Sequence, residues 1–94
     1  MDQAVILSTA RTAIGKAYRG SFNDTDAPTL ASHAIKASIN KSGVEPDEIE
    51  DVIMGAAVQQ GTQGYNIGRL SAIASGLPTK VPGMSVDRQC ASGL

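Results

Sequence analysis

The sequence has 94 residues, of which 41% are hydrophobic, and its 8 basic and 9 acidic residues give a net charge of −1. This size suits one small domain, and the balanced charge excludes the basic surface that nucleic-acid-binding domains need. No apolar run approaches the roughly 18 residues of a membrane span, so we expect neither nucleic acid nor membrane as a partner. A single cysteine cannot form an internal disulfide, which indicates a reducing compartment and therefore a cytoplasmic protein.

The first half of the chain predicts a strand and a long amphipathic helix. Residues 4–8 form a short apolar, β-branched run that is typical of a strand buried on both faces. A polar connection with several glycines follows, and Asp26 is the expected N-cap of a helix with Pro28 in its first turn. Small and apolar residues then recur at helical spacing, and Gly43 ends the helix.

The second half of the chain repeats this alternation. Residues 52–58 and 81–86 predict two further buried strands. Between them, Asn66 is the expected N-cap of a helix that runs to about Ser75. The expected packing residues of that segment are Leu70, Ile73 and Leu77. The order of elements predicts an α/β fold with a mostly parallel sheet and right-handed crossover connections.

The only cysteine, Cys90, follows the last predicted strand directly and precedes Ala91, Ser92 and Gly93. In an α/β protein, a side chain at this position projects from the edge of the sheet at the start of a helix. The helix dipole and the free N–H groups there favour an anion, and they can also bind an oxyanion during acyl transfer. A lone cysteine is, however, often a small buried hydrophobe. Cys90 is therefore a candidate catalytic nucleophile, with a purely structural role as the alternative.

The residues around Cys90 resemble a known signature. Residues 86–94, with the sequence VDRQCASGL, are similar to the acyl-enzyme cysteine signature of the thiolases, the acetyl-CoA acyltransferases. Residues 4–16 are similar to that family's opening strand and loop, and shorter matches follow at 50–55, 66–69 and 76–78. The resemblance runs over the whole chain, and the combination of motifs is specific although each motif alone is weak.

The resemblance implies a layered α/β/α sandwich with a mostly parallel sheet, incomplete in this chain. Residues 1–94 would be the N-terminal part of the thiolase N-terminal domain, ending just after the nucleophile loop. The implied activity is that of an acyl-CoA C-acyltransferase that forms an acyl-enzyme on Cys90, for thiolysis of a 3-ketoacyl-CoA or Claisen condensation of acetyl-CoA. CoA thioesters are then substrates, and neither a permanently bound cofactor nor a metal is expected. A homodimer or homotetramer is also implied, with an interface near Gln63, Asn66 and Arg69.

Two residues bear on this interpretation. Asp87 stands where the family usually has Asn, and we interpret it as a family variant that can change the hydrogen bonds of the loop. His33 lies on the polar face of the first predicted helix, which favours a solvated position over a role as the base for Cys90. In the thiolases, the activating histidine and a second catalytic cysteine lie in the C-terminal half. The resemblance therefore predicts that residues 1–94 alone are inactive.

Two alternatives remain open at this point. Another condensing enzyme of the thiolase superfamily, a ketoacyl synthase or a hydroxymethylglutaryl-CoA synthase, would also use a cysteine here. A non-catalytic module of the same fold that assembles with a partner chain fits as well. We also expect these residues to be part of a longer chain, because the last predicted helix stops after one turn and a three-stranded open sheet has unpaired edges.

Overall fold

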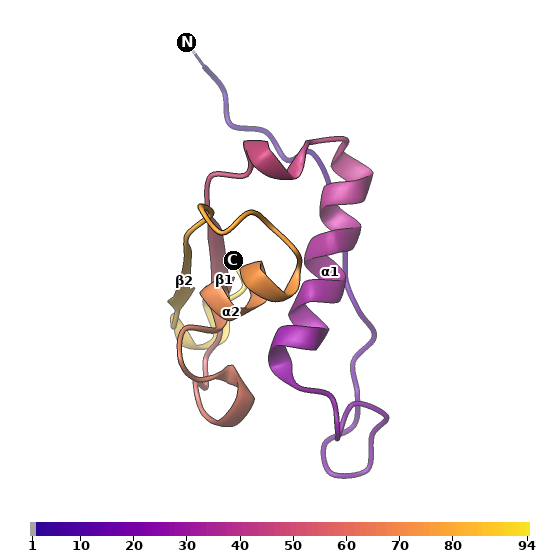
Figure 1. The fold of residues 1–94 in the computed structure, drawn as a ribbon. Helices are drawn as coiled ribbons and strands as arrows, with labels where there is room; N and C mark the ends of the chain where they lie inside the picture. The colour runs from indigo at the N-terminus through magenta and orange to yellow at the C-terminus, as the bar shows by residue number, and fades with distance from the viewer. Residues whose placement is uncertain (1) are drawn as a thin grey trace.

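A computed structural model describes residues 2–94 and contains two α-helices and a two-stranded parallel sheet (Figure 1). Helix α1 spans Ala27–Ser42 and helix α2 spans Ile67–Ala74. Strand β1 spans Val52–Gly55 and strand β2 spans Gly83–Val86. Three short 3₁₀ turns complete the order, namely η1 (Pro46–Glu48), η2 (Gly61–Gln63) and η3 (Gln89–Ala91). The predicted α/β class is confirmed.

The ends of α1 lie where the sequence places them. Oδ1 of Asp26 accepts a hydrogen bond of 2.8 Å from the Thr29 N–H, which supplies an acceptor to the first helical turn. Gly43 follows the last turn with φ 73°, a left-handed conformation that glycine adopts without a steric penalty. His33 is exposed, as its polar surroundings predict.

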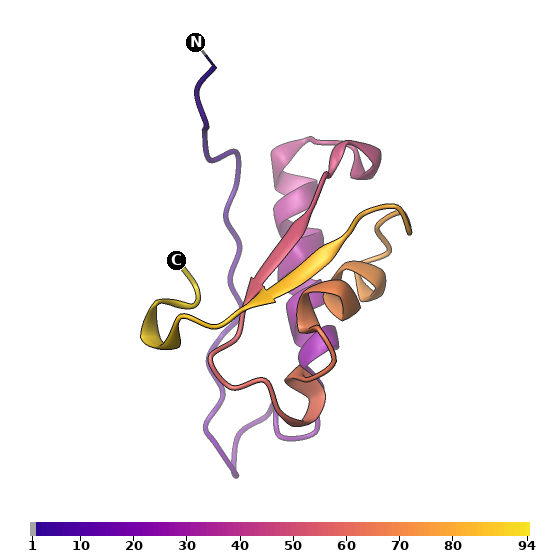
Figure 2. The same cartoon turned by 90° about the vertical axis from the view of Figure 1, so that its left-hand side faces the viewer.

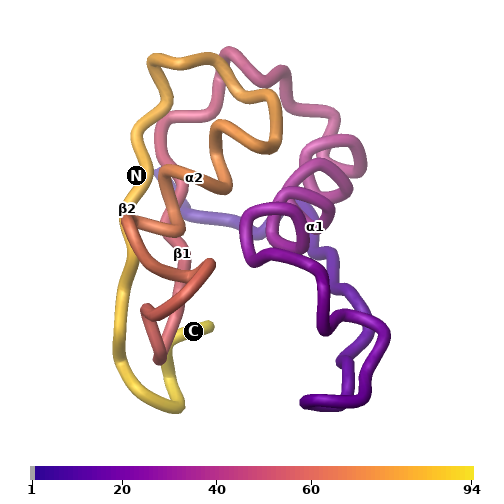
Figure 3. The backbone as a smooth tube through the Cα atoms, turned by 60° about the horizontal axis from the view of Figure 1, so that its bottom comes forward, coloured from indigo at the N-terminus to yellow at the C-terminus, as the bar shows by residue number. Residues whose placement is uncertain are grey.

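The β1–α2–β2 unit forms the centre of the structure. The strands run parallel, with Val52 paired to Gly83 and Gly55 paired to Val86. Both helices lie on the same side of the sheet (Figure 2), and α2 lies between α1 and the strands (Figure 3). A small core forms in this space from buried Ala72, Leu77 and Val81, against which pack Ile35, Ile39, Ile49 and Val52.

The predicted strand at residues 4–8 is wrong. This segment is not a strand in the structure, and Val5, Ile6 and Leu7 are 70%, 86% and 64% exposed. It runs instead beside α1, where the Ser8 hydroxyl donates a hydrogen bond of 2.6 Å to the Ser38 carbonyl. A β-branched sequence favours a strand through packing and pairing with neighbours. Among residues 2–94 the only ladder is that between β1 and β2, and it does not include this segment.

The burial predicted for the second half also needs correction. Leu70 and Ile73 are 39% and 46% exposed, because α2 turns a different face to the protein. The residues that α2 buries are Ile67, Gly68, Ser71 and Ala72. Gly68 explains why α2 turns this face to the strands. A Cβ at this position would overlap the backbone of Met84, and only a glycine allows this close approach.

The sheet is covered on one face only. Ile53 of β1 is 65% exposed and its register partner Met84 of β2 is 46% exposed, so neither strand is buried on both faces as predicted. Strand β1 also ends at Gly55, before the expected end at residue 58. Within residues 2–94, neither helix combines the length and the apolar character needed to cross a bilayer.

Candidate active site

Cys90 lies in the turn that follows β2, at the carboxyl end of the parallel sheet. Open α/β sheets bind their ligands at this edge. The turn is η3, a 3₁₀ turn of 3 residues that lies where the sequence predicts a single turn of helix. The Cys90 side chain is exposed and its thiol is free. The dipole of a regular helix therefore does not act on this sulfur within residues 2–94.

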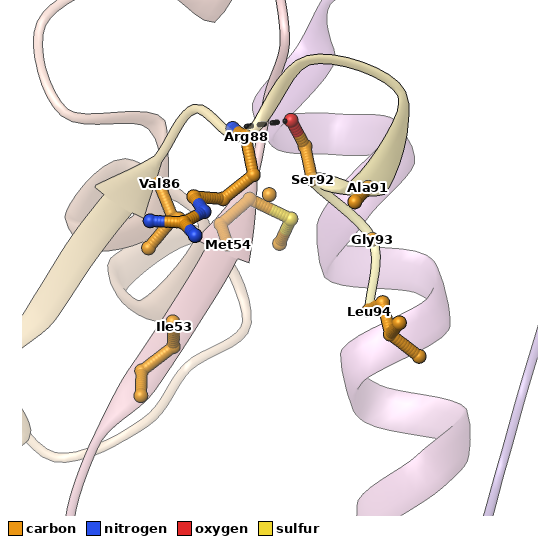
Figure 4. Close-up of a pocket in the computed structure, with 9 residues that line it drawn as sticks. Ile53, Met54, Val86, Arg88, Ala91, Ser92, Gly93 and Leu94 are labelled. Carbon is orange, nitrogen blue, oxygen red and sulfur yellow. Dashed lines mark hydrogen bonds between the residues drawn. The ribbon is translucent and has the colours of Figure 1, made fainter.

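Side chains on both sides of Cys90 hold its turn together. Oδ1 of Asp87 accepts hydrogen bonds from the Gln89 N–H at 2.9 Å and from Gln89 Nε2 at 3.4 Å. The Ser92 hydroxyl accepts a hydrogen bond of 2.9 Å from the Arg88 N–H (Figure 4). The same hydroxyl donates a hydrogen bond of 2.7 Å to the Gln89 carbonyl. Asp87 thus takes part in the hydrogen bonds of this loop, and both of its bonds are accepted by the same carboxylate oxygen, Oδ1.

The backbone N–H groups of this turn are largely engaged. Those of Arg88 and Gln89 donate to side chains, while those of Ala91 and Ser92 donate to the carbonyls of Arg88 and Gln89 at 3.1 Å each. The N–H of Cys90 is not among these donors. It is the group in the turn that remains suited to hydrogen-bond an oxyanion formed next to the sulfur.

Gly55, the last residue of β1, allows the turn to lie against the sheet. A Cβ at this position would overlap the Ser92 carbonyl and reach to 3.0 Å from the Gly93 nitrogen. A groove of about 730 Å³ lies where the strands meet the turn, and Met54 and Arg88 are among its lining residues (Figure 4). Cys90 does not line this groove, so the groove is not a pocket for its thiol.

The structure separates His33 from Cys90. His33 lines a different cavity, beside Arg11, Phe22 and Thr29, and no hydrogen bond joins it to the turn. No group of three or more His, Cys, Asp or Glu side chains among residues 2–94 is placed to hold a metal ion.

The three residues predicted near an interface have different positions. Asn66 is the N-cap of α2, where its Oδ1 accepts from the Arg69 N–H at 3.2 Å and its Nδ2 donates to the Gly83 carbonyl at 2.9 Å. The Arg69 guanidinium donates to the carbonyls of Val81 and, at 3.0 Å, Thr79. Asn66 therefore joins α2 to β2, Arg69 joins α2 to the segment that precedes β2, and exposed Gln63 lies in η2.

Comparison with known proteins identifies the family. Residues 4–94 match the family described as thiolase, N-terminal domain. The chain belongs to the thiolase family. An acetyl-CoA acetyltransferase of Cupriavidus necator is 44% identical over 94 residues, which cover 100% of this chain and 23% of that protein.

Two thiolases show the same pattern of coverage. The peroxisomal 3-ketoacyl-CoA thiolase 1 of Arabidopsis thaliana is 41% identical over 93 residues, which are 99% of this chain and 21% of that protein. The 3-ketoacyl-CoA thiolase of Bacillus subtilis is 38% identical over 94 residues, which are 100% of this chain and 24% of that protein. The chain thus spans less than a quarter of the length of each of these relatives, and the thiolase match includes the whole Cys90 turn.

The sequence singles out Cys90 as a candidate, but it does not indicate which residues shape the surroundings of this side chain. The roles of Gly55 and Ser92 depend on a contact between the end of β1 and the turn, which no local pattern in the sequence shows. One local signal was present, because an Asp two residues before Gln89 is typical of a side chain that accepts from a backbone N–H.

Proposed function

We propose that this chain supplies the nucleophile of an acyl-CoA C-acyltransferase, with Cys90 as the residue that becomes acylated. The observation that carries the proposal is the thiolase match over residues 4–94, which includes a free and exposed cysteine at the carboxyl end of the sheet. The names of the relatives support the class of activity.

In the direction of synthesis, the Cys90 thiolate attacks the thioester carbonyl of acetyl-CoA. The tetrahedral oxyanion collapses, the bond from carbon to the CoA sulfur breaks, and CoA leaves with a proton while the acetyl group stays on Cys90. The carbanion of a second acetyl-CoA then attacks the acetyl-enzyme, which forms the new carbon–carbon bond and restores the thiolate.

In the direction of degradation, the Cys90 thiolate attacks the keto carbon of a 3-ketoacyl-CoA. The bond between the keto carbon and C2, the carbon next to the thioester carbonyl, breaks. The resulting carbanion of acetyl-CoA takes up a proton, and acetyl-CoA leaves. A CoA thiol then removes the acyl group from Cys90. Both directions exchange groups between sulfur and carbon without a change of redox state. CoA thioesters, together with free CoA in the direction of degradation, therefore suffice as substrates, and no bound cofactor is needed.

We further propose a cytoplasmic homodimer or homotetramer with an interface near Gln63, Asn66 and Arg69. The single cysteine supports a reducing compartment, and the exposed Gln63 is available to a second copy. Light scattering coupled to size-exclusion chromatography, with Gln63→Ala as the variant, tests the oligomer. A mass of one polypeptide at micromolar concentration argues against it.

The test of the acyl-enzyme is the intact mass of the purified natural polypeptide that contains these residues. After brief incubation with acetyl-CoA and acid quenching, we expect one added acetyl group that maps to the peptide containing Cys90. The Cys90→Ser variant is the control and should remain unmodified under the same conditions. An unmodified wild-type protein, or an acetyl group on another residue, would reject the proposal.

A further inference from the structure

The side chains of Asp87 and Ser92 lie on either side of Cys90 and form hydrogen bonds within its turn. We propose that Ser92 and Asp87 are positioning residues that hold Gln89 in a left-handed conformation and thereby direct the Cys90 sulfur toward the acyl carbon. This inference rests on the proposed function of Cys90. The alternative is that these bonds only stabilise a surface turn.

The conformation of Gln89 is the first observation. Its φ is 53°, and the residue is not a glycine. For an L-residue with a Cβ, this left-handed region costs about 1–2 kcal/mol, because the Cβ comes close to the neighbouring carbonyl oxygen. Such a conformation persists where the surroundings hold it, and it tends to be found at functional sites. Here it directly precedes the candidate nucleophile.

The hydrogen bonds around Gln89 are the second observation. Asp87 Oδ1 accepts from the Gln89 N–H at 2.9 Å, which fixes the peptide group before Gln89. The Ser92 hydroxyl donates to the Gln89 carbonyl at 2.7 Å, which fixes the peptide group that continues into Cys90. Both dihedral angles of Gln89 are therefore held by side chains from outside that residue.

Ser92 in turn is held by the sheet. Its hydroxyl also accepts from the Arg88 N–H at 2.9 Å (Figure 4), and its carbonyl lies against Gly55 at the end of β1. The orientation of the sulfur is thus linked, through Ser92, to the end of β1. Acyl transfer needs the attacking atom within about 3–3.5 Å of the carbonyl carbon and above the plane of the thioester carbonyl, so a loosened turn slows acylation.

The test compares two reactions of the same sulfur in the purified natural polypeptide. Acylation by acetyl-CoA in a single turnover needs the sulfur to be directed at a bound thioester. Alkylation by iodoacetamide needs only an accessible thiolate. The variants are Ser92→Ala and Ser92→Thr, Asp87→Ala and Asp87→Asn, and the matched control Ser42→Ala.

Ser42 is a suitable control because its hydroxyl makes the same two kinds of bond elsewhere. It donates to the Ile39 carbonyl at 2.7 Å and accepts from the Val44 N–H at 3.1 Å, at the end of α1. We expect Ser92→Ala and Asp87→Ala to slow acylation about 10- to 100-fold while alkylation is unchanged. Ser92→Thr and Asp87→Asn keep the required hydroxyl or acceptor oxygen and should recover most of the acylation rate. Ser42→Ala should leave acylation unchanged.

Each other outcome overturns the inference in a recognisable way. Equal slowing of acylation and alkylation by the alanine variants, or slowing by Ser42→Ala, would assign these bonds to stability alone. If Ser92→Ala does not fold, the comparison of Asp87→Ala with Asp87→Asn tests the inference alone. An Asp87→Ala variant with the wild-type acylation rate would then overturn the positioning role. A wild-type protein that is not acylated on Cys90 rejects the proposed function instead, and the inference with it.

Discussion

At the scale of single residues, the polar side chains of this chain act mainly on its own backbone. Asp26 is a clear case, because its carboxylate caps α1 by accepting from the Thr29 N–H. Hydrogen bonds from the Thr29 side chain and backbone hold the pKa of Asp26 below its ordinary value of 3.8. A carboxyl group with a lowered pKa in the folded state binds its proton more weakly there than in the unfolded chain.

This difference predicts a pH-dependent contribution of Asp26 to stability. The contribution is fully present above the unfolded-state pKa near 3.8 and is lost as the pH falls through the lower folded-state pKa. The Asp26→Asn variant keeps an acceptor oxygen but cannot titrate. Its stability relative to the wild type should therefore be lowest near neutral pH and should rise as the solution is acidified. Urea unfolding across this range measures the difference, and a difference that does not change with pH contradicts the prediction.

Gly55 gives a prediction about the site itself. A Cβ at this position overlaps the Ser92 carbonyl, so Gly55→Ala should displace the Cys90 turn and destabilise the protein by about 1–3 kcal/mol. Acylation of Cys90 should slow because its turn moves. Gly43→Ala is a useful comparison, since nothing lies within 4 Å of a Cβ there and its cost comes only from the positive φ. If Gly55→Ala and Gly43→Ala are acylated at the same rate, the close approach of Gly55 to the Ser92 carbonyl is not needed for the reaction of Cys90.

At the scale of elements, α2 is fastened to β2 at the N-terminal end of the helix. The Asn66 side chain accepts from the Arg69 N–H and from the Ser85 hydroxyl, and it donates to the Gly83 carbonyl. Asn66 has φ 60°, which Asn tolerates better than most residues. A single amide thus caps the helix and sets its position along the strand that leads to Cys90.

The two functions of Asn66 can be separated by substitution. Asn66→Gly keeps the left-handed backbone but removes both the cap and the bond to Gly83, and it should cost about 1–2 kcal/mol of unfolding free energy. Asn66→Asp keeps the capping oxygen and loses only the Nδ2 donor, so its cost should be smaller. Denaturant unfolding with both variants gives the two values. Equal costs would mean that the cap contributes nothing.

The elements also show what a sequence can and cannot predict. The ends of α1 and the start of α2 follow from local chemistry, since Asp26, Gly43 and Asn66 act on the backbone within a few residues of themselves. The strand predicted at residues 4–8 failed because a strand depends on a partner distant in sequence. The buried face of α2 failed for the same reason, since the close approach of Gly68 to Met84 joins two separate elements. The position of Cys90 in a turn directly after a strand was predictable from the sequence, whereas the contact of Ser92 with Gly55 was not.

At the scale of the whole molecule, the turn that contains Cys90 and the cavity that contains His33 lie in different parts of the described structure. Both helices cover one face of the sheet (Figure 2), while Ile53 and Met84 remain exposed. The turn with Cys90 lies at one end of the sheet, and His33 lines a separate cavity beside Arg11. The proposed nucleophile, Cys90, and the imidazole of His33 therefore line different parts of the described structure.

This separation predicts that a polypeptide restricted to these 94 residues is inactive. A positioned general base contributes typically 10²–10⁴-fold to rate, and removing one member of a group that acts together costs most of that rate. Because His33 does not bond to the Cys90 turn, we expect no turnover of acetyl-CoA or a 3-ketoacyl-CoA above the buffer rate. The measurement is CoA release by the isolated polypeptide, with monomeric mass and helical circular dichroism confirmed beforehand. The His33→Ala variant is the control, and turnover that it abolishes would show that His33 serves as the base after all.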